Sequence, residues 1–248
     1  MSVDALERLR RIEAKVRTDG RVRVQDLAAQ LEVSEMTIRR DLDLLAADGV
    51  VQRVRGGAVA IGPQPFADRF TRHMRAKDRI AAKLVDLVDD GGAIGIDASS
   101  TLQRLAVQLG AVRDLTVVTN GPDTFAALQG RPGVTALLTG GQLDPRTGSL
   151  VGPIATRSAR SLLLRRLFVS ATALDPERGT SESTLEDADA KLALADVAAE
   201  VVVAVDSSKL GQRAPARALP PDRVALLVTE LEPSDPRLDP YRERWVLR

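Results

Sequence analysis

Several polar residues in this chain have the types and spacing needed to bind an anion. Residues 97–101 read Asp-Ala-Ser-Ser-Thr, and they stand between an apolar run and a helical pattern. Hydroxyls and backbone N–H groups at the start of a helix attract anions, because these donors are unpaired and the helix dipole favours negative charge there. This segment therefore predicts a site for a phosphate group.

Similar polar residues follow other apolar runs further along the chain. Ligands of parallel α/β sheets bind at the carboxyl ends of the strands, so residues in these positions meet at one edge of the sheet. Lysines near that edge would add positive charge. The residues that we expect to contact a small ligand are Asp97, Ser99, Ser100, Thr101, Asn120, Gly121, Gly141, Lys191, Asp206 and Lys209.

The first sixty residues have a different pattern, which favours binding to duplex DNA. Apolar spacing predicts helices over residues 3–17 and 24–31, and a third helix that begins after Ser34 and stops at Asp48 and Gly49. A β-branched run over residues 50–60 then predicts a two-stranded hairpin. Three short helices followed by a basic hairpin are typical of a winged helix-turn-helix.

The third helix of such a unit can enter the major groove, and its early residues face the bases. Residues 1–62 carry 11 Lys and Arg against 10 Asp and Glu, so DNA binding requires that the basic side chains gather on one face. Near base edges and phosphates we expect Ser34, Glu35, Thr37 and Arg39. Contacts mostly to the phosphate backbone are expected from Arg40, Arg53 and Arg55.

The rest of the chain alternates strand-like and helix-like runs. Residues 61–72, with Pro63 and Pro65, read as a connector, and a long helical pattern covers residues 71–89. Strands are then predicted at 93–97, 115–119, 134–139, 167–171, 201–206 and 224–229, with helices at 102–109, 124–128, 154–164 and 187–199. This order predicts a mostly parallel sheet covered on both faces. The expected domains are thus residues 1–60, a linker over 61–72, and an α/β domain over 73–248.

The composition excludes several kinds of protein. Aromatic residues make up only 2% of the 248 residues, which argues against binding of single-stranded nucleic acid or RNA by base stacking. There is no cysteine and only one histidine, so we expect no metal site and no cofactor. No stretch approaches the length of a membrane span, and the expected location is the cytoplasm.

The literal sequence resembles a known family. VSEMTIRRDLDLLAADGVVQRVRGGA, residues 33–58, matches every fixed position of the DeoR-type helix-turn-helix pattern VSxxTIRRDLxxLxxxGxxxRxxGGA. GIDASST (95–101), VVTNG (117–121), LTGGQL (138–143), EDADAKLALADVA (186–198) and VDSSKLG (205–211) look like successive blocks of the DeoR-type sensor domain. In this family the sensor domain is related to ribose-5-phosphate isomerase and binds phosphorylated sugars or related intermediates without converting them.

The resemblance implies a transcription regulator rather than an enzyme, with no catalytic residues. We expect a repressor of carbohydrate use that binds double-stranded operator DNA as a homo-oligomer, a dimer or tetramer, and contacts no membrane. It also implies that Asp97, Ser99, Ser100, Thr101, Asn120, Lys191 and Lys209 contact the effector. Induction and co-repression are both compatible with this pattern.

Two departures from the family pattern leave alternatives open. Ser99 stands where the family usually has glycine, so a loop that required positive φ would be reshaped. SATALD, residues 170–175, lacks glycines common at that strand end, which would narrow a pocket. One alternative is an oligomerisation module that no longer binds an effector. The other is a sugar-phosphate isomerase, for which Asp97, Asp206, Glu186 and Asp187 could supply a base.

Overall fold

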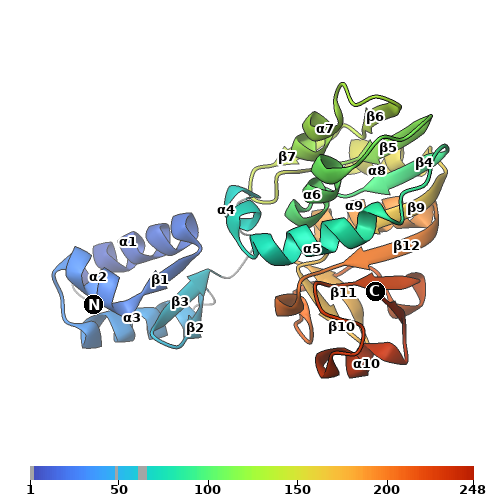
Figure 1. Cartoon of the computed structure of the whole chain (residues 1–248). Helices are drawn as coiled ribbons and strands as arrows, with labels where there is room; N and C mark the ends of the chain where they lie inside the picture. Colours follow the sequence, from blue (N-terminus) through green and yellow to red (C-terminus); the bar gives the residue numbers. More distant parts are fainter. Residues whose placement is uncertain (1–2, 48–49, 61–65) are drawn as a thin grey trace. The chain divides into compact units, whose positions relative to one another are not determined.

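The computed structural model describes residues 3–47, 50–60 and 66–248. The chain divides into two units, residues 1–69 and residues 70–248 (Figure 1). The predicted helix stop at Asp48 and Gly49, and Pro63 and Pro65 of the predicted connector, lie outside the described residues.

The first unit has three helices: α1 (Val3–Asp19), α2 (Val24–Leu31) and α3 (Glu35–Ala47). Each has an apolar stripe at helical spacing, and these stripes pack together into one small core. Ile12 of α1, Leu27 of α2 and Ile38 of α3 are fully buried in it. The helices predicted over residues 3–17, 24–31 and after Ser34 are therefore confirmed.

A three-stranded sheet completes this unit. Its strands are β1 (Arg21–Arg23), β2 (Val51–Val54) and β3 (Gly57–Ala60), in the order β1-β3-β2. The predicted hairpin is confirmed, but the third strand, β1, was not predicted because three residues carry too little pattern. The close approach of β1 explains Gly57, since a Cβ atom there would lie 2.0 Å from the carbonyl oxygen of Val22.

An ion pair joins α1 to α3. Arg8 Nε donates to Asp41 Oδ2 at 2.6 Å, and Arg8 Nη2 donates to Asp41 Oδ1 at 3.2 Å. Asp41 is almost completely buried. Because this bidentate contact fixes the angle between the helices, Asp41 has a structural role in the TIRRDL segment.

The second unit is built on a seven-stranded parallel sheet in the order β15-β14-β12-β9-β4-β5-β6. Its strands are β4 (Ala93–Ile96), β5 (Leu115–Thr119), β6 (Val134–Leu138), β9 (Leu164–Val169), β12 (Ala198–Ala204), β14 (Leu226–Val228) and β15 (Val246–Leu247). The predicted parallel α/β fold is confirmed. The two-residue strand β15 was not predicted.

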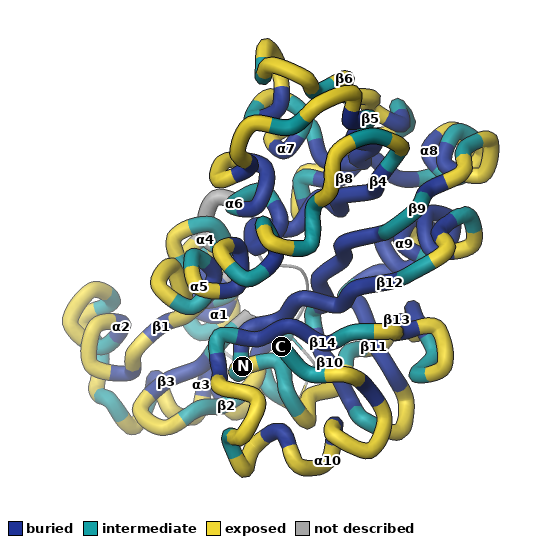
Figure 2. Tube along the Cα trace, turned by 45° about the vertical axis from the view of Figure 1, so that its right-hand side comes forward, coloured by how far each residue is buried: buried dark blue, intermediate teal, exposed yellow. Residues whose placement is uncertain are grey.

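Helices cover both faces of this sheet. On one face lie α5 (Met74–Val85), α6 (Ser100–Gln108) and α7 (Pro122–Leu128), which pack on Ile94, Val117 and Phe168. On the other face lie α8 (Pro153–Arg160) and α9 (Leu185–Asp196), together with Tyr241 and Trp245 near the C-terminus. Figure 2 shows that the strands in the middle of the sheet are buried along most of their length.

Several predicted boundaries were wrong. Residues 66–71 of the predicted connector form a helix, α4 (Phe66–Thr71). The long helix predicted over 71–89 starts only at Met74, because His73 adopts a left-handed conformation with φ of 52°. The helix predicted over 154–164 ends at Arg160, and β9 already begins at Leu164 rather than at 167.

Short antiparallel strands were missed. These are β7 (Gln142–Asp144) with β8 (Ser149–Val151), and β10 (Ala173–Asp175) with β11 (Gly179–Glu182) and β13 (Ala216–Arg217). In β11 most residues are polar although all of them are buried. The sequence therefore lacks the alternation of apolar and polar residues by which a strand is recognised. Short helices follow at η1 (Ser207–Lys209), η2 (Pro221–Arg223), η3 (Pro236–Leu238) and α10 (Asp239–Arg242). None of the described helices has the length and apolar character to cross a bilayer.

Candidate functional site

The start of α3 is the first candidate surface. Ser34 precedes the helix, and its Oγ accepts a hydrogen bond from the backbone N–H of Thr37 at 3.2 Å, as expected of an N-cap. The two hydroxyls also lie 2.9 Å apart. Glu35 Oε2 accepts from Arg39 Nη2 at 2.9 Å, one helical turn away. Four of the predicted DNA-contacting residues are thus paired with one another on one exposed turn.

The other predicted DNA contacts are three arginines, which differ in whether their side chains are already paired within the protein. Arg53 on β2 donates to Asp43 at 2.8 Å and to the carbonyl of Gly57 at 2.7 Å, so it braces the hairpin against α3. Arg40 and Arg55 are exposed, and neither forms an ion pair in the part of the chain that the structure describes. These two arginines remain available to phosphates.

Met36 was not predicted as a contact residue. It is the second residue of α3, its side chain is 62% exposed, and Arg40 follows one turn later on the same side of the helix. The inner face of the helix consists of Ile38, Leu42 and Leu45, which are buried. A large apolar residue off that stripe, at the start of the helix, was the signal that could have identified Met36.

The carboxyl edge of the parallel sheet is the second candidate site. Asp97 directly follows β4 and is fully buried. Its Oδ1 accepts from the N–H of Ser99 and its Oδ2 from the N–H of Ser170, both at 2.9 Å. Since both oxygens hold backbone segments, Asp97 joins the end of β4 to the end of β9. The segment after β9 that lacks glycine is therefore used to bind this carboxylate.

Ser99, which stands where the family usually has glycine, needs no positive φ in this loop. It adopts φ of −76° and ψ of 150°, an extended conformation open to any residue, and its side chain accepts from the N–H of Leu102 as the N-cap of α6. Ser100 and Thr101 form the first turn of that helix and are buried. The predicted helix start after β4 is thus present, with Ser99 as its cap.

Lys77 brings a positive charge to this helix start, and it was not predicted. Its Nζ donates to Ser100 Oγ at 2.9 Å, and its side chain is almost fully buried. The sequence carried a signal, since Lys77, Ile80, Ala81 and Leu84 have the spacing of one buried helix face. A lysine in an apolar stripe indicates a specific partner, because burial of an unpaired charge is costly.

Lys191 lies among three carboxylates. Its Nζ donates to Glu182 Oε1 at 2.7 Å and to the carbonyl oxygen of Ser170 at 3.0 Å. Oxygens of Asp97 and Asp187 lie 3.5 and 3.7 Å from it. The predicted neighbours Asp97 and Lys191 are thus brought together. The ammonium is already surrounded by negative charge. Its first role is therefore structural, since it joins α9 to β11 and to the ends of β4 and β9.

The three carboxylates surround one ammonium, and burial and charge together shift the pKa of Glu182 and of Lys191. Burial raises the pKa of Glu182 from 4.5 to about 7, against the attraction of Lys191, and the charge of Asp187 adds to the rise. Burial alone would lower the pKa of Lys191, but the charges of Glu182, Asp187 and Asp97 outweigh burial and raise it. Lys191 is therefore charged at neutral pH, where Glu182 holds a proton part of the time.

This arrangement predicts a pH dependence of stability. Between the ordinary pKa of Glu182, 4.5, and its folded value of about 7, the folded state binds more protons than the unfolded state. The free energy of unfolding should therefore fall as the pH rises through this window, by roughly 1 to 3 kcal/mol from this group. Urea unfolding at a series of pH values should show this slope in the wild type and a flatter one in Glu182→Gln. Glu177→Gln, at an exposed position, should keep the wild-type slope.

Three more predicted residues lie beside this edge and pack its backbone. Asn120 Oδ1 accepts from the N–H of Ala98 at 3.1 Å, and its Nδ2 donates to the carbonyl of Leu150 at 3.3 Å. A Cβ atom on Gly121 would lie 2.7 Å from the Cα of Ala98, and one on Gly141 would lie 2.7 Å from a backbone oxygen of Val151. The two glycines therefore permit close contact between backbone segments.

Asp206 and Lys209 follow β12, which is separated from β4 by β9 in the sheet order. Asp206 Oδ1 accepts from the N–H and the hydroxyl of Ser208 and so begins the short helix η1. Lys209 is half-buried, and its side chain forms no ion pair among the described residues. No hydrogen bond or ion pair within the described ranges joins either residue to the cluster around Lys191.

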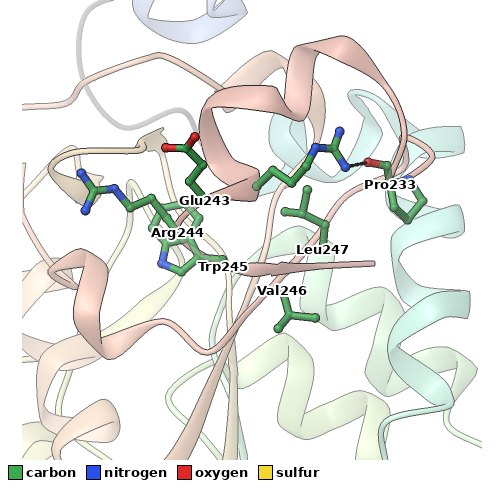
Figure 3. A pocket seen from close by; sticks show the side chains of 7 residues that line it. Pro233, Glu243, Arg244, Trp245, Val246 and Leu247 are labelled. Carbon is green, nitrogen blue, oxygen red and sulfur yellow. Dashed lines mark hydrogen bonds between the residues drawn. The ribbon is translucent and has the colours of Figure 1, made fainter.

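A separate pocket lies in the C-terminal segment (Figure 3). Arg242 is one of its lining residues and donates to the carbonyl of Pro233 at 2.6 Å. Its lining consists of Pro233 and residues 242–247, so it contains none of the predicted ligand contacts. Among the described residues no group of three or more His, Asp or Glu side chains is arranged to hold a metal ion.

Comparison with known proteins agrees with this two-part organisation. Residues 8–64 match the family described as the DeoR-like helix-turn-helix domain, and residues 72–231 match the DeoR C terminal sensor domain. The HTH-type transcriptional regulator GolR of Listeria innocua is 30% identical over 228 residues, which cover 90% of this chain and 90% of that protein.

The lactose phosphotransferase system repressor of Lactococcus lactis is 31% identical over 209 residues, 82% of either chain. Among solved structures, ribose 5-phosphate isomerase A from Methanocaldococcus jannaschii is similar with 19% identity and a TM-score of 0.39, over 54% of this chain and 53% of the other. The sequence relatives therefore match both units, whereas the isomerase is too distant to carry an argument about chemistry.

Proposed function

The chain belongs to the DeoR family of transcriptional regulators, and from this premise we propose that it is a repressor of a carbohydrate-utilisation operon, active in the cytoplasm. Its helix-turn-helix unit would bind double-stranded operator DNA, and residues 73–248 would bind a phosphorylated sugar or a related metabolite. The observation that carries the proposal is the exposed start of α3, where Arg39 and Arg40 lie on a helix whose opposite face is buried.

Affinity for DNA requires more than one such unit. A single winged helix buries a modest surface, whereas a symmetric homo-oligomer, a dimer or tetramer, can hold two or more half-sites at once. An effector can change operator affinity only as far as it binds one conformation of this oligomer better than another. The sign of that preference decides between induction and co-repression.

The start of α6 is the proposed site for the phosphate of the effector. Support comes from the buried first turn of α6 and from Lys77, which places an ammonium 2.9 Å from the Ser100 hydroxyl. Thermal unfolding should show that a phosphorylated sugar raises the melting temperature of the protein and that the same sugar without phosphate does not. Lys77→Met should abolish the difference. If the second unit is instead an oligomerisation module that no longer binds an effector, no phosphate ester should raise the melting temperature.

A sensor binds a sugar phosphate without converting it, whereas an isomerase converts it to product. The relatives are named as transcriptional regulators, and the carboxylates at the sheet edge are already held by backbone N–H groups and Lys191. We therefore expect stoichiometric binding of a sugar phosphate without conversion. Steady conversion of aldose to ketose phosphate by the purified protein would support the enzyme instead.

Met36 should read a thymine methyl group. Apolar side chains in the major groove contact the C5-methyl of thymine, and Met36 is exposed at the end of α3 that faces the bases. On an operator obtained by selection from random DNA, replacement of one thymine in each half-site by deoxyuridine should weaken binding about fourfold per methyl. Met36→Ala should be insensitive to the same replacement. Leu44→Ala, at an exposed position near the other end of α3, should respond like the wild type.

A further inference from the structure

The edge strand β6 has an open row of hydrogen-bonding groups. It is the last strand of the sheet, next to β5. Gly133 accepts from Leu115, and Thr139 donates to Thr119, so the odd-numbered residues of this segment turn their backbone groups towards β5. The even-numbered residues Ala136 and Leu138 therefore turn their N–H and C=O groups away from the sheet. Within the described residues no strand pairs with that side.

This edge lacks the features that usually prevent pairing between sheets. Such edges are commonly blocked by charged side chains, by proline or by bulges. From Pro132 to Leu143 the chain has no ionisable side chain, and β6 itself contains no proline. The opposite edge strand, β15, has only two residues and is followed by Arg248. Of the two edges of the seven-stranded sheet, as far as the structure describes it, the β6 edge alone is therefore both open and neutral.

Apolar side chains lie along the same edge. Leu137 is 41% exposed, Leu138 37%, Leu143 52% and Ile154 59%. Ile154 at the start of α8 lies beside Gly140, directly after β6. Figure 2 shows the trace of β6 as exposed or half-buried, unlike the strands in the middle of the sheet. A cluster of exposed apolar residues beside an open strand edge is typical of an interaction surface.

We infer that β6 pairs with β6 of a second copy of this chain, antiparallel and about a two-fold axis through Leu137. In this register Ala136 of each copy faces Leu138 of the other, and the outward backbone groups form four hydrogen bonds. The two Leu137 side chains meet on one face as a pair without hydrogen bonds, where side chains approach most closely. The two sheets become one continuous sheet.

A second copy fits this edge better than another partner because the surface is complementary to itself. In a two-fold interface each residue near the axis faces its own copy, so any charge there would face a like charge. Because β6 is neutral, two copies of it can meet without that repulsion. Its outward N–H and C=O groups can then pair with those of the second copy. This inference assigns a surface to the homo-oligomer of the proposed function, and therefore rests on it in part.

The test uses the full chain and opposite charges at position 137. Sedimentation velocity should show that wild-type protein associates at micromolar concentration. Leu137→Glu and Leu137→Lys alone should each raise the dissociation constant at least tenfold, because like charges meet at the axis. An equimolar mixture of the two should associate again. Val246→Glu, at an exposed apolar position on the opposite edge strand, should behave like the wild type.

A second variant tests the backbone part of the register. Ala136→Pro removes an outward N–H that has no partner in β5, so it should weaken association while thermal unfolding stays close to that of the wild type. A monomeric wild type, or variants at 137 that associate as the wild type does, would overturn the inference. If the protein still bound operator DNA in either of these cases, the proposed function would remain supported although the inference about β6 had failed. A dimer that depends on Leu137 but binds no DNA would support the pairing of β6 and contradict the proposed function.

Discussion

Lys191→Met should destabilise the second unit by about 3 to 5 kcal/mol at pH 7, the cost expected when one partner of a buried ion pair is removed. The variant would leave Asp97, Glu182 and Asp187 close together without the ammonium that now lies within 3.7 Å of all three. Loss of the attraction of Lys191 would then raise the pKa of Glu182 further. Urea unfolding followed by circular dichroism measures the change.

The same variant should recover part of its stability at lower pH. As the pH falls towards 5, protonation of Glu182, whose pKa burial already raises to about 7, favours the folded state and leaves fewer buried charges unpaired. Lys209→Met serves as the matched control, because Lys209 follows a strand of the same sheet and forms no ion pair among the described residues. Its effect should stay within about 0.5 kcal/mol. Equal losses in both variants would contradict the role assigned to Lys191.

Arg39→Ala should weaken operator binding by about 1 to 3 kcal/mol and relax the preference at one base position, if this side chain reads a base. In the free protein Arg39 is paired with Glu35 on an exposed turn, and such a pair contributes little to stability. The fold should therefore be unaffected, and the loss should appear in DNA binding alone. Fluorescence anisotropy with matched and altered operators measures both effects.

Arg11→Ala is the control for charge, since Arg11 is exposed and lies on α1 rather than on α3. It removes the same charge from the same unit and should change operator affinity far less. Glu35→Ala releases Arg39 from its partner and should not reduce affinity as Arg39→Ala does. An Arg39→Ala variant with unchanged affinity would remove Arg39 from the proposed contacts.

Elements with strong local patterns could be predicted from the sequence. The stripe Ile38, Leu42 and Leu45 behind a serine cap placed α3, and the alternation of β-branched runs with helical runs gave the parallel sheet. The carboxyl edge follows from general properties of such sheets, and Asp97 and Lys191, both predicted for this edge, lie 3.5 Å apart.

Contacts made by short or polar segments could not be predicted. Glu182 lies on β11, where buried Thr and Ser residues resemble a loop, so nothing marked it as the closest partner of Lys191. The conformation at Ser99 could not be predicted either, because a glycine in a family pattern does not establish positive φ, and here the backbone is extended. Lys77 could have been found, since its position in an apolar stripe was visible.

The most direct test of the account is a footprint of the purified protein on the DNA upstream of its own gene, with and without candidate phosphorylated sugars. We predict protection of paired half-sites whose centres are about 10 base pairs, or a multiple of that spacing, apart, and an altered protection when the cognate sugar phosphate is added. Uniform, salt-sensitive protection without any preferred site would contradict the assignment of α3 as an operator-reading helix.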